Sequence, residues 1–292
     1  PKLVYGYVSG YGEKGPDKDL PGFDFTAFYA RGGILGPLRD KNSLPMLTVQ
    51  GFGDHQVAMN LAAGVLAALF KAKMTGEGDH VVVSLFHSAI WDISLMLQAS
   101  QYGADSTQYP MERWKLGNPL VLCYETADGQ WLQIAMPQYD RHYPILMNAM
   151  GYPELADDAR YYPQKNLIPN REEFSAWITA EFKKKTCDEW CKLLDANDLP
   201  YAIAQEWDSL LEDKQAWASD CFYEMSYSNG NKRTLVRPPV LFDQMGLPPY
   251  ERGPYLGEQT KDILGELGYS AEAIDELIKS GAAIDMDPVL RD

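Results

Sequence analysis

The clearest pattern of hydrophobic and polar positions predicts a helix, a strand and a second helix in succession within the first hundred residues. From His55 to Lys73, apolar side chains recur with helical spacing. Thr75-Gly76-Glu77-Gly78 ends this helix, and the Val-rich run Val81–Leu85 is typical of a strand covered on both faces of a parallel sheet. A further apolar helix is expected from about His87 to Gln101. This order of elements predicts a doubly wound α/β layer.

The segment before this helix has the pattern of a strand, a turn-rich loop and a short helix. Leu3–Ser9 is a β-prone run closed by Gly10 and Gly12, and a short helix is expected over Phe25–Arg31, before Gly32-Gly33. Because the chain opens inside a strand, without a first β-α unit, the expected sheet would have an exposed edge. We therefore expect a preceding segment, or another chain, to supply the missing part.

Beyond Pro110 the pattern changes to that of a smaller α+β domain. The apolar runs Leu120–Tyr124 and Trp131–Met136 flank Asp128-Gly129, a strong hairpin signal. Further helices are expected near 140–150, 171–184, 187–196, 207–219, 257–267 and 271–279, with a boundary at Arg237-Pro238-Pro239. We expect a large domain over 1–105, a linker over 106–119, a small domain over 120–230, and over 231–292 a return segment with the C-terminal helices of the large domain.

Composition excludes several classes of protein. The chain has 292 residues, 46% of them hydrophobic, which is enough for a full core, and its net charge of −15 argues against a nucleic-acid partner. The longest apolar run, Leu61–Phe70, is shorter than a bilayer span, and no signal peptide opens the chain, so we expect a cytoplasmic protein with no membrane partner. The four cysteines and four histidines lack the spacings of metal sites, and we expect free thiols and no metal.

Asp54, in Gly51-Phe52-Gly53-Asp54-His55, stands at the start of the long helix. One interpretation is a helix N-cap, a position that favours Asp. The other is a nucleophile, because a carboxylate there lies in the positive end of the helix dipole, near amides that can hold an oxyanion. The glycines beside it would let a bulky ligand approach the backbone. Spacing alone leaves both interpretations open, and they are compatible.

Three stretches in combination resemble the family III CoA transferases. Pro45–Ser84 contains the Gly-x-Gly-Asp, the Ala-rich helix, a Thr-Gly-x-Gly and the Val-rich strand; Gly10–Asp24 and Pro254–Thr260 match further signatures. The stretch Gly10–Asp24 is most similar to the clostridial members that move CoA onto 2-hydroxy acids. The resemblance extends over nearly the whole chain.

The resemblance implies a Rossmann-like large domain, a small α+β domain and a homodimer of two interlocked rings. It places Asp54 on the catalytic aspartate, which attacks an acyl-CoA thioester and passes through mixed anhydrides and an aspartyl-CoA thioester. CoA is then part of the substrate, and no tightly bound cofactor is expected. The same comparison suggests a substrate- or CoA-binding role for Gly53, Phe23, Asp24, Arg31 and Leu85. For three of them an ordinary role remains open: Asp24 as the cap of the helix near Phe25, Arg31 as a solvated charge, and Leu85 as core.

Two departures from family patterns narrow the chemistry. Phe23 stands where the related 2-methylacyl-CoA racemases have a proton-transferring His, and a Phe cannot exchange a proton. The linker Arg113–Pro119 is bulkier than the glycine run of the formyl-CoA transferases, which suggests a larger apolar acyl group. We expect CoA transfer from an acyl-CoA or enoyl-CoA donor to an aromatic or branched 2-hydroxy acid. The alternatives are a 2-methylacyl-CoA racemase or epimerase, and an inactive fragment or subunit that needs a partner chain.

Overall fold

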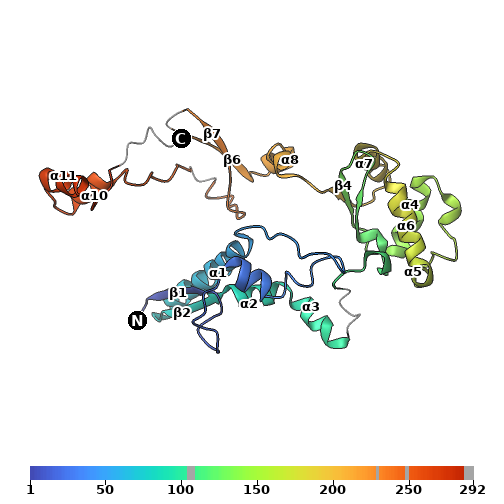
Figure 1. Ribbon diagram of the computed structural model, residues 1–292, viewed down its shortest axis with the longest axis horizontal. Helices are drawn as coiled ribbons and strands as arrows, with labels where there is room; N and C mark the ends of the chain where they lie inside the picture. The colour runs from blue at the N-terminus through green and yellow to red at the C-terminus, as the bar shows by residue number, and fades with distance from the viewer. Residues whose placement is uncertain (104–108, 228–229, 247–249, 286–292) are drawn as a thin grey trace. The chain divides into compact units, whose positions relative to one another are not determined.

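The computed structural model describes residues 1–103, 109–227, 230–246 and 250–285. The chain divides into two compact units, Pro1–Ala204 and Gln205–Asp292 (Figure 1). We describe each unit by itself. Of the linker expected over 106–119, residues 106–108 lie outside the described part of the chain.

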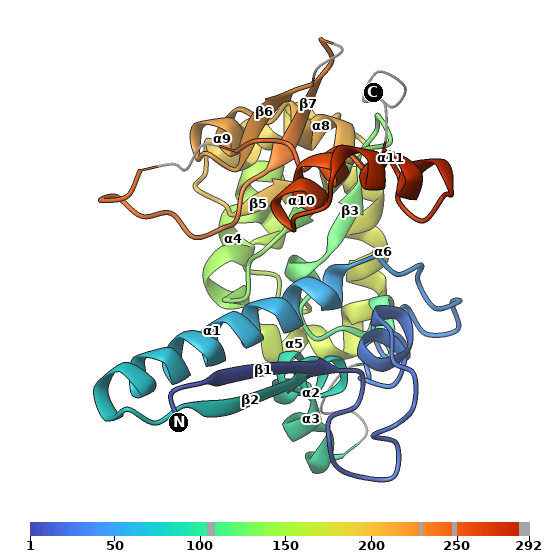
Figure 2. The same ribbon diagram turned by 90° about the vertical axis from the view of Figure 1, so that its left-hand side faces the viewer.

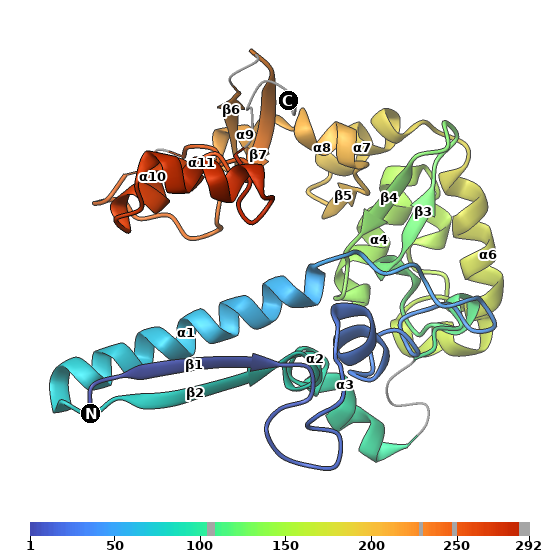
Figure 3. The ribbon, with the colours of Figure 1, turned by 60° about the vertical axis from the view of Figure 1, so that its left-hand side comes forward.

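The first unit begins with a parallel β-α-β arrangement. Strand β1 (Val4–Ser9) pairs in parallel with β2 (Asp79–Ser84), and their register runs without interruption from Val4 opposite Asp79 to Ser9 opposite Ser84. The helix between them, α1 (Phe52–Thr75), lies along the pair (Figures 2 and 3). Gly64 permits this close approach, because a Cβ there would lie 2.6 Å from Val81 Cγ1. The predicted helix and the parallel pairing of the predicted strand are confirmed. Strand β2 is not covered on both faces, however, because Ser84 is its one buried residue in this two-stranded sheet.

Helix α1 is more apolar than the sequence pattern suggested. By length and composition alone it could cross a membrane, and only 17% of its most apolar window is buried in the described chain. This corrects the expectation that no apolar run reaches that length. The core helices of soluble proteins pass the same test. The run Leu61–Phe70 underestimates the apolar length of this helix. Over its 24 residues, α1 contains only three charged side chains, Asp54, Lys71 and Lys73.

A small core joins these elements to the short helices around them. The π-helical turn η1 (Asp24–Ala30) and helix α2 (Leu85–Asp92) pack together with α1 through buried side chains. These are Ala27, Phe28, Tyr29, Ile34, Val57, Leu85 and Ala89. The single helix expected over 87–101 is instead divided into α2, α3 (Ser94–Ala99) and η2 (Ser100–Tyr102). It breaks at Ile93, which leaves the helical conformation and packs against this core.

The rest of the first unit forms a separate, larger core. Strands β3 (Cys123–Glu125), β4 (Trp131–Ile134) and β5 (Tyr201–Ile203) form an antiparallel sheet in that order. The Asp-Gly hairpin is confirmed, with Gly129 at φ 78° in its turn. The helices of this part are α4 (Tyr139–Met150), α5 (Gln164–Leu167), α6 (Arg171–Phe182) and α7 (Cys187–Asp195), and the 3-10 turns are η3 (Arg113–Lys115), η4 (Pro119–Val121), η5 (Pro153–Leu155) and η6 (Ile168–Asn170).

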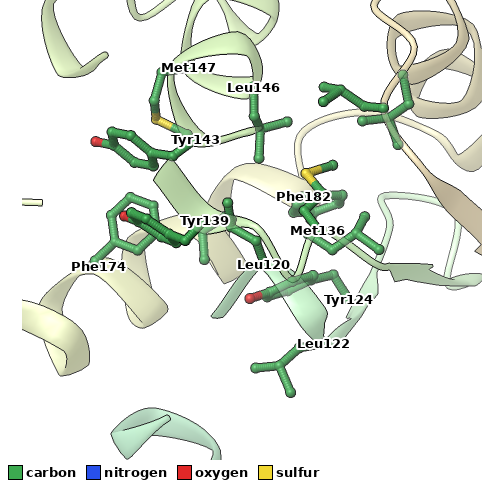
Figure 4. Close-up of a cluster of buried hydrophobic side chains, with 14 of the residues drawn as sticks. Leu120, Leu122, Tyr124, Met136, Tyr139, Tyr143, Leu146, Met147, Phe174 and Phe182 are labelled. Carbon is green, nitrogen blue, oxygen red and sulfur yellow. The ribbon is translucent and has the colours of Figure 1, made fainter. Parts of the chain in front are cut away.

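Aromatic rings fill the centre of this larger core (Figure 4). Tyr139 stacks on Tyr143 with ring centroids 4.9 Å apart, and Tyr124 stacks on Phe182 at 4.6 Å. The Tyr124 hydroxyl donates to the Pro119 carbonyl at 2.6 Å, so that its polar end is satisfied inside the core. Such stacked, fully buried rings give this part of the chain its own stable interior.

The second unit contains a hairpin and two pairs of short helices. Helices α8 (Trp207–Leu211) and α9 (Lys214–Ala218) replace the single helix expected over 207–219, because Asp213 ends one turn and caps the next by accepting from the Ala216 amide at 2.8 Å. Strands β6 (Phe222–Ser226) and β7 (Lys232–Val236) pair antiparallel. Helices α10 (Thr260–Glu266) and α11 (Ala271–Lys279) confirm the two predicted C-terminal helices.

Candidate active site

The loop that carries Asp54 enters α1 through Gly51. Gly51 adopts φ 81°, a left-handed conformation that favours glycine, and α1 begins at the next residue. Asp54 is therefore the third residue of the helix and not its N-cap, so the capping interpretation of Asp54 is wrong. Its side chain is exposed, within the first turn, where the helix dipole favours a negative charge.

The carboxylate of Asp24 holds this loop from 27 residues upstream. It is buried, and its Oδ2 accepts from the Gly51 amide at 2.8 Å while its Oδ1 accepts from the Gly53 amide at 3.0 Å. The expectation that Asp24 caps the helix near Phe25 is also wrong, since η1 starts after Phe23, whose amide donates to Thr26 Oγ1. Asp24 instead caps α1 in place of a local side chain, because the N-cap position is a glycine and has no side chain to accept.

Gly53 lies against two side chains of η1 with no room for a methyl group. A Cβ at this position would lie 2.3 Å from Phe28 Cγ and 2.4 Å from Asp24 Oδ1. Phe28 is fully buried and packs edge-on against Tyr29, whose hydroxyl donates to the Val49 carbonyl at 3.2 Å. Burial and the charge of Asp24 raise the pKa of Tyr29, so its hydroxyl stays neutral as a donor. The ring of Phe28 and the carboxylate of Asp24 thus fix the backbone next to Asp54.

Four amides of this turn are already engaged. The Gly51 and Gly53 N–H groups donate to Asp24, the Phe52 N–H donates to the Val49 carbonyl at 3.4 Å, and the His55 N–H donates to the Gly51 carbonyl at 3.0 Å. These four groups therefore do not face an incoming oxyanion in this conformation. The contribution of Gly53 visible in the structure is close packing.

The other residues singled out in the sequence lie in different surroundings. Phe23 is 67% exposed, next to the buried Asp24. Leu85 is buried in the small core. Arg31 forms an ion pair with Asp17, and its guanidinium lies 5.2 Å from the Tyr11 ring centroid and 5.7 Å from that of Phe86. Arg31 thereby ties the loop after β1 to η1.

Two adjoining cavities open at the carboxyl ends of β1 and β2. One, of about 460 Å³, lies between the loop Tyr11–Lys14 and the start of α2; the other, of about 250 Å³, is lined by Asn60, Ser84, His87, Ser88 and Trp91. In α/β sheets ligands bind outside the carboxyl ends of the strands. Sequence analysis did not single out Asn60 or His87. The signal was the group of polar residues Ser84, His87 and Ser88 at the end of the Val-rich strand.

No group of three or more His, Cys, Asp or Glu side chains that could hold a metal occurs among the residues that the structure describes. The four cysteines are free thiols. The reactive group that the site offers is the exposed carboxylate of Asp54. It lies at the rigid start of α1, directly after the turn that contains Gly51 and Gly53.

Comparison with known proteins gives this site its context. The model of CoA-transferase family III matches residues 1–260. The chain is 48% identical over 280 residues to the cinnamoyl-CoA:phenyllactate CoA-transferase of Clostridium sporogenes and 39% identical over 275 residues to the (R)-2-hydroxy-4-methylpentanoate CoA-transferase of Clostridioides difficile. These alignments cover 96% and 94% of the chain, and 68% of each relative. The human alpha-methylacyl-CoA racemase is 23% identical, over 95% of the chain and 70% of the racemase.

Solved structures agree at the level of the fold. The M. tuberculosis protein Rv3272 aligns with a TM-score of 0.74 and 24% identity, over 89% of this chain and 68% of that one. A CAIB/BAIF family protein from Brucella suis aligns with a TM-score of 0.74 and 22% identity, over 91% and 68%. The chain therefore has the mixed α/β fold of these proteins, and it belongs to CoA-transferase family III.

Proposed function

We propose that the enzyme moves CoA from an acyl-CoA or enoyl-CoA donor to an aromatic or branched 2-hydroxy acid, with Asp54 as the covalent carrier. The observation that carries the substrate class is the 48% identity to a cinnamoyl-CoA:phenyllactate CoA-transferase, supported by the 39% identity to an (R)-2-hydroxy-4-methylpentanoate CoA-transferase. Two observations support the assignment of Asp54. It is the last residue of the Gly-x-Gly-Asp motif, and Asp24 and Phe28 hold the preceding turn in place.

The reaction proceeds by two exchanges at the Asp54 carboxyl. A carboxylate oxygen of Asp54 attacks the donor thioester carbonyl; the C–O bond forms, the C–S bond breaks, and CoA leaves as a thiolate. The thiolate then attacks the Asp54 carbonyl of this anhydride, releasing the donor acid as a carboxylate and leaving an aspartyl-CoA thioester.

The acceptor repeats these steps in reverse order. Its carboxylate attacks the aspartyl thioester and frees the thiolate, which attacks the acceptor carbonyl of the second anhydride and restores the Asp54 carboxylate. No net proton is taken up or released. Each anhydride must be kept from water, which requires a covered site around an Asp54 that is exposed in this chain.

We further propose the assembly and domain division that the family resemblance implies. These are a Rossmann-like large domain over 1–105 and 231–292, a linker over 106–119, a small domain over 120–230, and an interlocked homodimer. The position of Asp54 and the packing of α1 on β1, β2 and η1 support the interpretation of α1 as a core helix of the enzyme. Four free thiols support a reducing, cytoplasmic location.

Intact-mass spectrometry after mixing with cinnamoyl-CoA tests the carrier role. A CoA adduct is expected on the unmodified enzyme, cleaved by hydroxylamine and absent in Asp54→Ala. His55→Gln is the matched control, because His55 is adjacent and exposed, and it should keep the adduct. Turnover without any adduct, or an adduct that survives in Asp54→Ala, would contradict the proposal.

The racemase alternative is separated by isotope exchange. A racemase exchanges the substrate α-proton with solvent deuterium without moving CoA. Because Phe23 cannot exchange a proton, we expect CoA transfer and no deuterium at the α-carbon. Incorporation of deuterium in the absence of an acceptor acid would favour the racemase.

A further inference from the structure

The four residues Val49–Phe52 form a β-turn directly before Asp54. The Phe52 N–H donates to the Val49 carbonyl at 3.4 Å, which closes the turn. Gly51, at its third position, has φ 81° and ψ −1°, the values of the third residue of a type II turn. The turn ends two residues before Asp54, so its geometry sets where α1 begins and where Asp54 stands.

Tyr29 holds the first carbonyl of this turn. Its hydroxyl donates to the Val49 oxygen at 3.2 Å, the same oxygen that accepts from the Phe52 N–H. Tyr29 is 6% exposed, and its ring lies 6.3 Å from the Phe52 ring, centroid to centroid. Val49 and Gln50 are themselves exposed, so burial of their own side chains does not anchor this end of the turn.

The winding of η1 brings Tyr29 and Asp24 to the same side. They are five residues apart, and in an α-helix this spacing corresponds to about 140° around the axis, so the two side chains would diverge. In a π-helix the backbone hydrogen bonds join residues five apart, as the Arg31 N–H and the Thr26 carbonyl do at 2.9 Å, so positions i and i+5 lie on the same side. Asp24 and Tyr29 consequently reach the same turn, one through its amides and the other through its first carbonyl.

We propose that Tyr29 is a positioning residue for CoA transfer, which together with Asp24 clamps the turn before Asp54, and that the π-helical winding of η1 makes this clamp possible. The inference rests on the proposed role of Asp54 as carrier. The Asp54 carboxyl reacts first as a nucleophile and then as an electrophile, so its backbone must stay in place while the reactants change. Tyr29 acts through the Val49 carbonyl and not on the substrate.

Tyr29→Phe tests this role, because it removes the hydroxyl and keeps the ring. Intact-mass spectrometry at short times after mixing with cinnamoyl-CoA gives the rate of adduct formation. We expect this rate and kcat to fall about tenfold, less than the about 100-fold cost of a 1 Å misplacement. The KM for the donor should change by less than about twofold, because the interaction lost is not one with the ground-state substrate.

Tyr143→Phe is the matched control. The Tyr143 hydroxyl also donates to a backbone carbonyl, that of Leu155 at 2.7 Å, but in the larger core. Both variants lose a hydrogen bond of the same kind, so both should lower the thermal midpoint, whereas only Tyr29→Phe should slow adduct formation. Hydrogen exchange at the Phe52 and Gly53 amides should be about fivefold faster in Tyr29→Phe alone, and it reports on the turn without any substrate.

Three results would each overturn the proposal: unchanged exchange in Tyr29→Phe, equal slowing of adduct formation in the two variants, or a raised KM with unchanged kcat. A parent enzyme that forms no adduct contradicts the proposed function itself. That failure is distinguishable, because exchange at the turn amides is measured without substrate and still shows whether Tyr29 clamps the turn.

Discussion

Replacing Gly53 by alanine should damage both stability and catalysis, although it adds only one methyl group. The new Cβ would lie 2.3 Å from Phe28 Cγ and 2.4 Å from Asp24 Oδ1, whereas ordinary contacts begin near 3.4 Å. The ring and the carboxylate must each retreat by about 1 Å, and overpacking of this kind costs about 1–3 kcal/mol. Retreat of Asp24 also weakens a hydrogen bond to a charged group, worth about 1.5–3 kcal/mol. We expect a total loss of about 3–5 kcal/mol in the free energy of unfolding.

We also expect an effect on catalysis, because the substituted residue, Gly53, is next to Asp54, the proposed carrier, and the clash can move their shared backbone. A shift of about 1 Å in a reacting group can lower the rate about 100-fold. We therefore expect the kcat for CoA transfer in Gly53→Ala to fall by about that factor. Urea unfolding followed by tryptophan fluorescence measures the stability, and steady-state transfer and adduct formation measure the activity.

Gly51→Ala is the matched control for this experiment. Gly51 has φ 81°, and a Cβ there meets nothing nearer than His55 Cε1 at 4.0 Å, so the cost is backbone strain of about 1–2 kcal/mol without a clash. Phe28→Leu combined with Gly53→Ala should recover part of the loss, because it removes ring atoms from the contact. Equal stability and activity of Gly53→Ala and Gly51→Ala would refute the packing argument.

Further predictions concern charges and thiols. Asp24→Asn should lower stability by about 2 kcal/mol and speed hydrogen exchange at the Gly53 amide, because one acceptor is lost; unchanged exchange would contradict the capping role. Burial raises the pKa of Cys187 to about 11, so iodoacetamide at pH 8.5 should label the exposed Cys221 first, as read by peptide mass mapping. The unfolded thiol loses its proton at lower pH than the folded one, so this contribution to stability should fall as pH rises from about 9 to 11; a Cys187→Ala variant should lose that slope. Arg31→Gln should lower the free energy of unfolding by less than about 1 kcal/mol, since its ion pair is exposed. It should nevertheless raise the KM for the CoA donor; an unchanged KM would show that the loop after β1 does not take part in CoA binding.

The sequence predicted those parts of the fold that are encoded by local periodicity. The helix of α1, the Asp-Gly hairpin and α11 all follow from spacing or turn chemistry within a few residues. Strands β5, β6 and β7 were not predicted. Strand β5 has three residues and owes its state to pairing with β4, far away in the chain, which no local pattern records.

The residues of the candidate site likewise divide into those indicated by local sequence and those that depend on the tertiary fold. Asp54 was found because its Gly-x-Gly-Asp is contiguous in sequence. Asp24 was assigned to the nearest helix, because local capping is the usual role of such a residue, whereas its partners are the amides of Gly51 and Gly53. These two hydrogen bonds join residues that are 27 and 29 positions apart in the sequence. They depend on the tertiary fold, and the spacing of residues does not indicate them.

The contact of Gly53 with Phe28 and Asp24 also limits how the enzyme can evolve. A side chain at position 53 needs a smaller residue at 28 and a different cap at 24 at the same time, and each change alone is harmful. Among relatives, these three positions should therefore vary together or not at all. Changes in substrate preference should accumulate instead at exposed positions such as Phe23, where a substitution leaves Asp54, the proposed nucleophile, undisturbed.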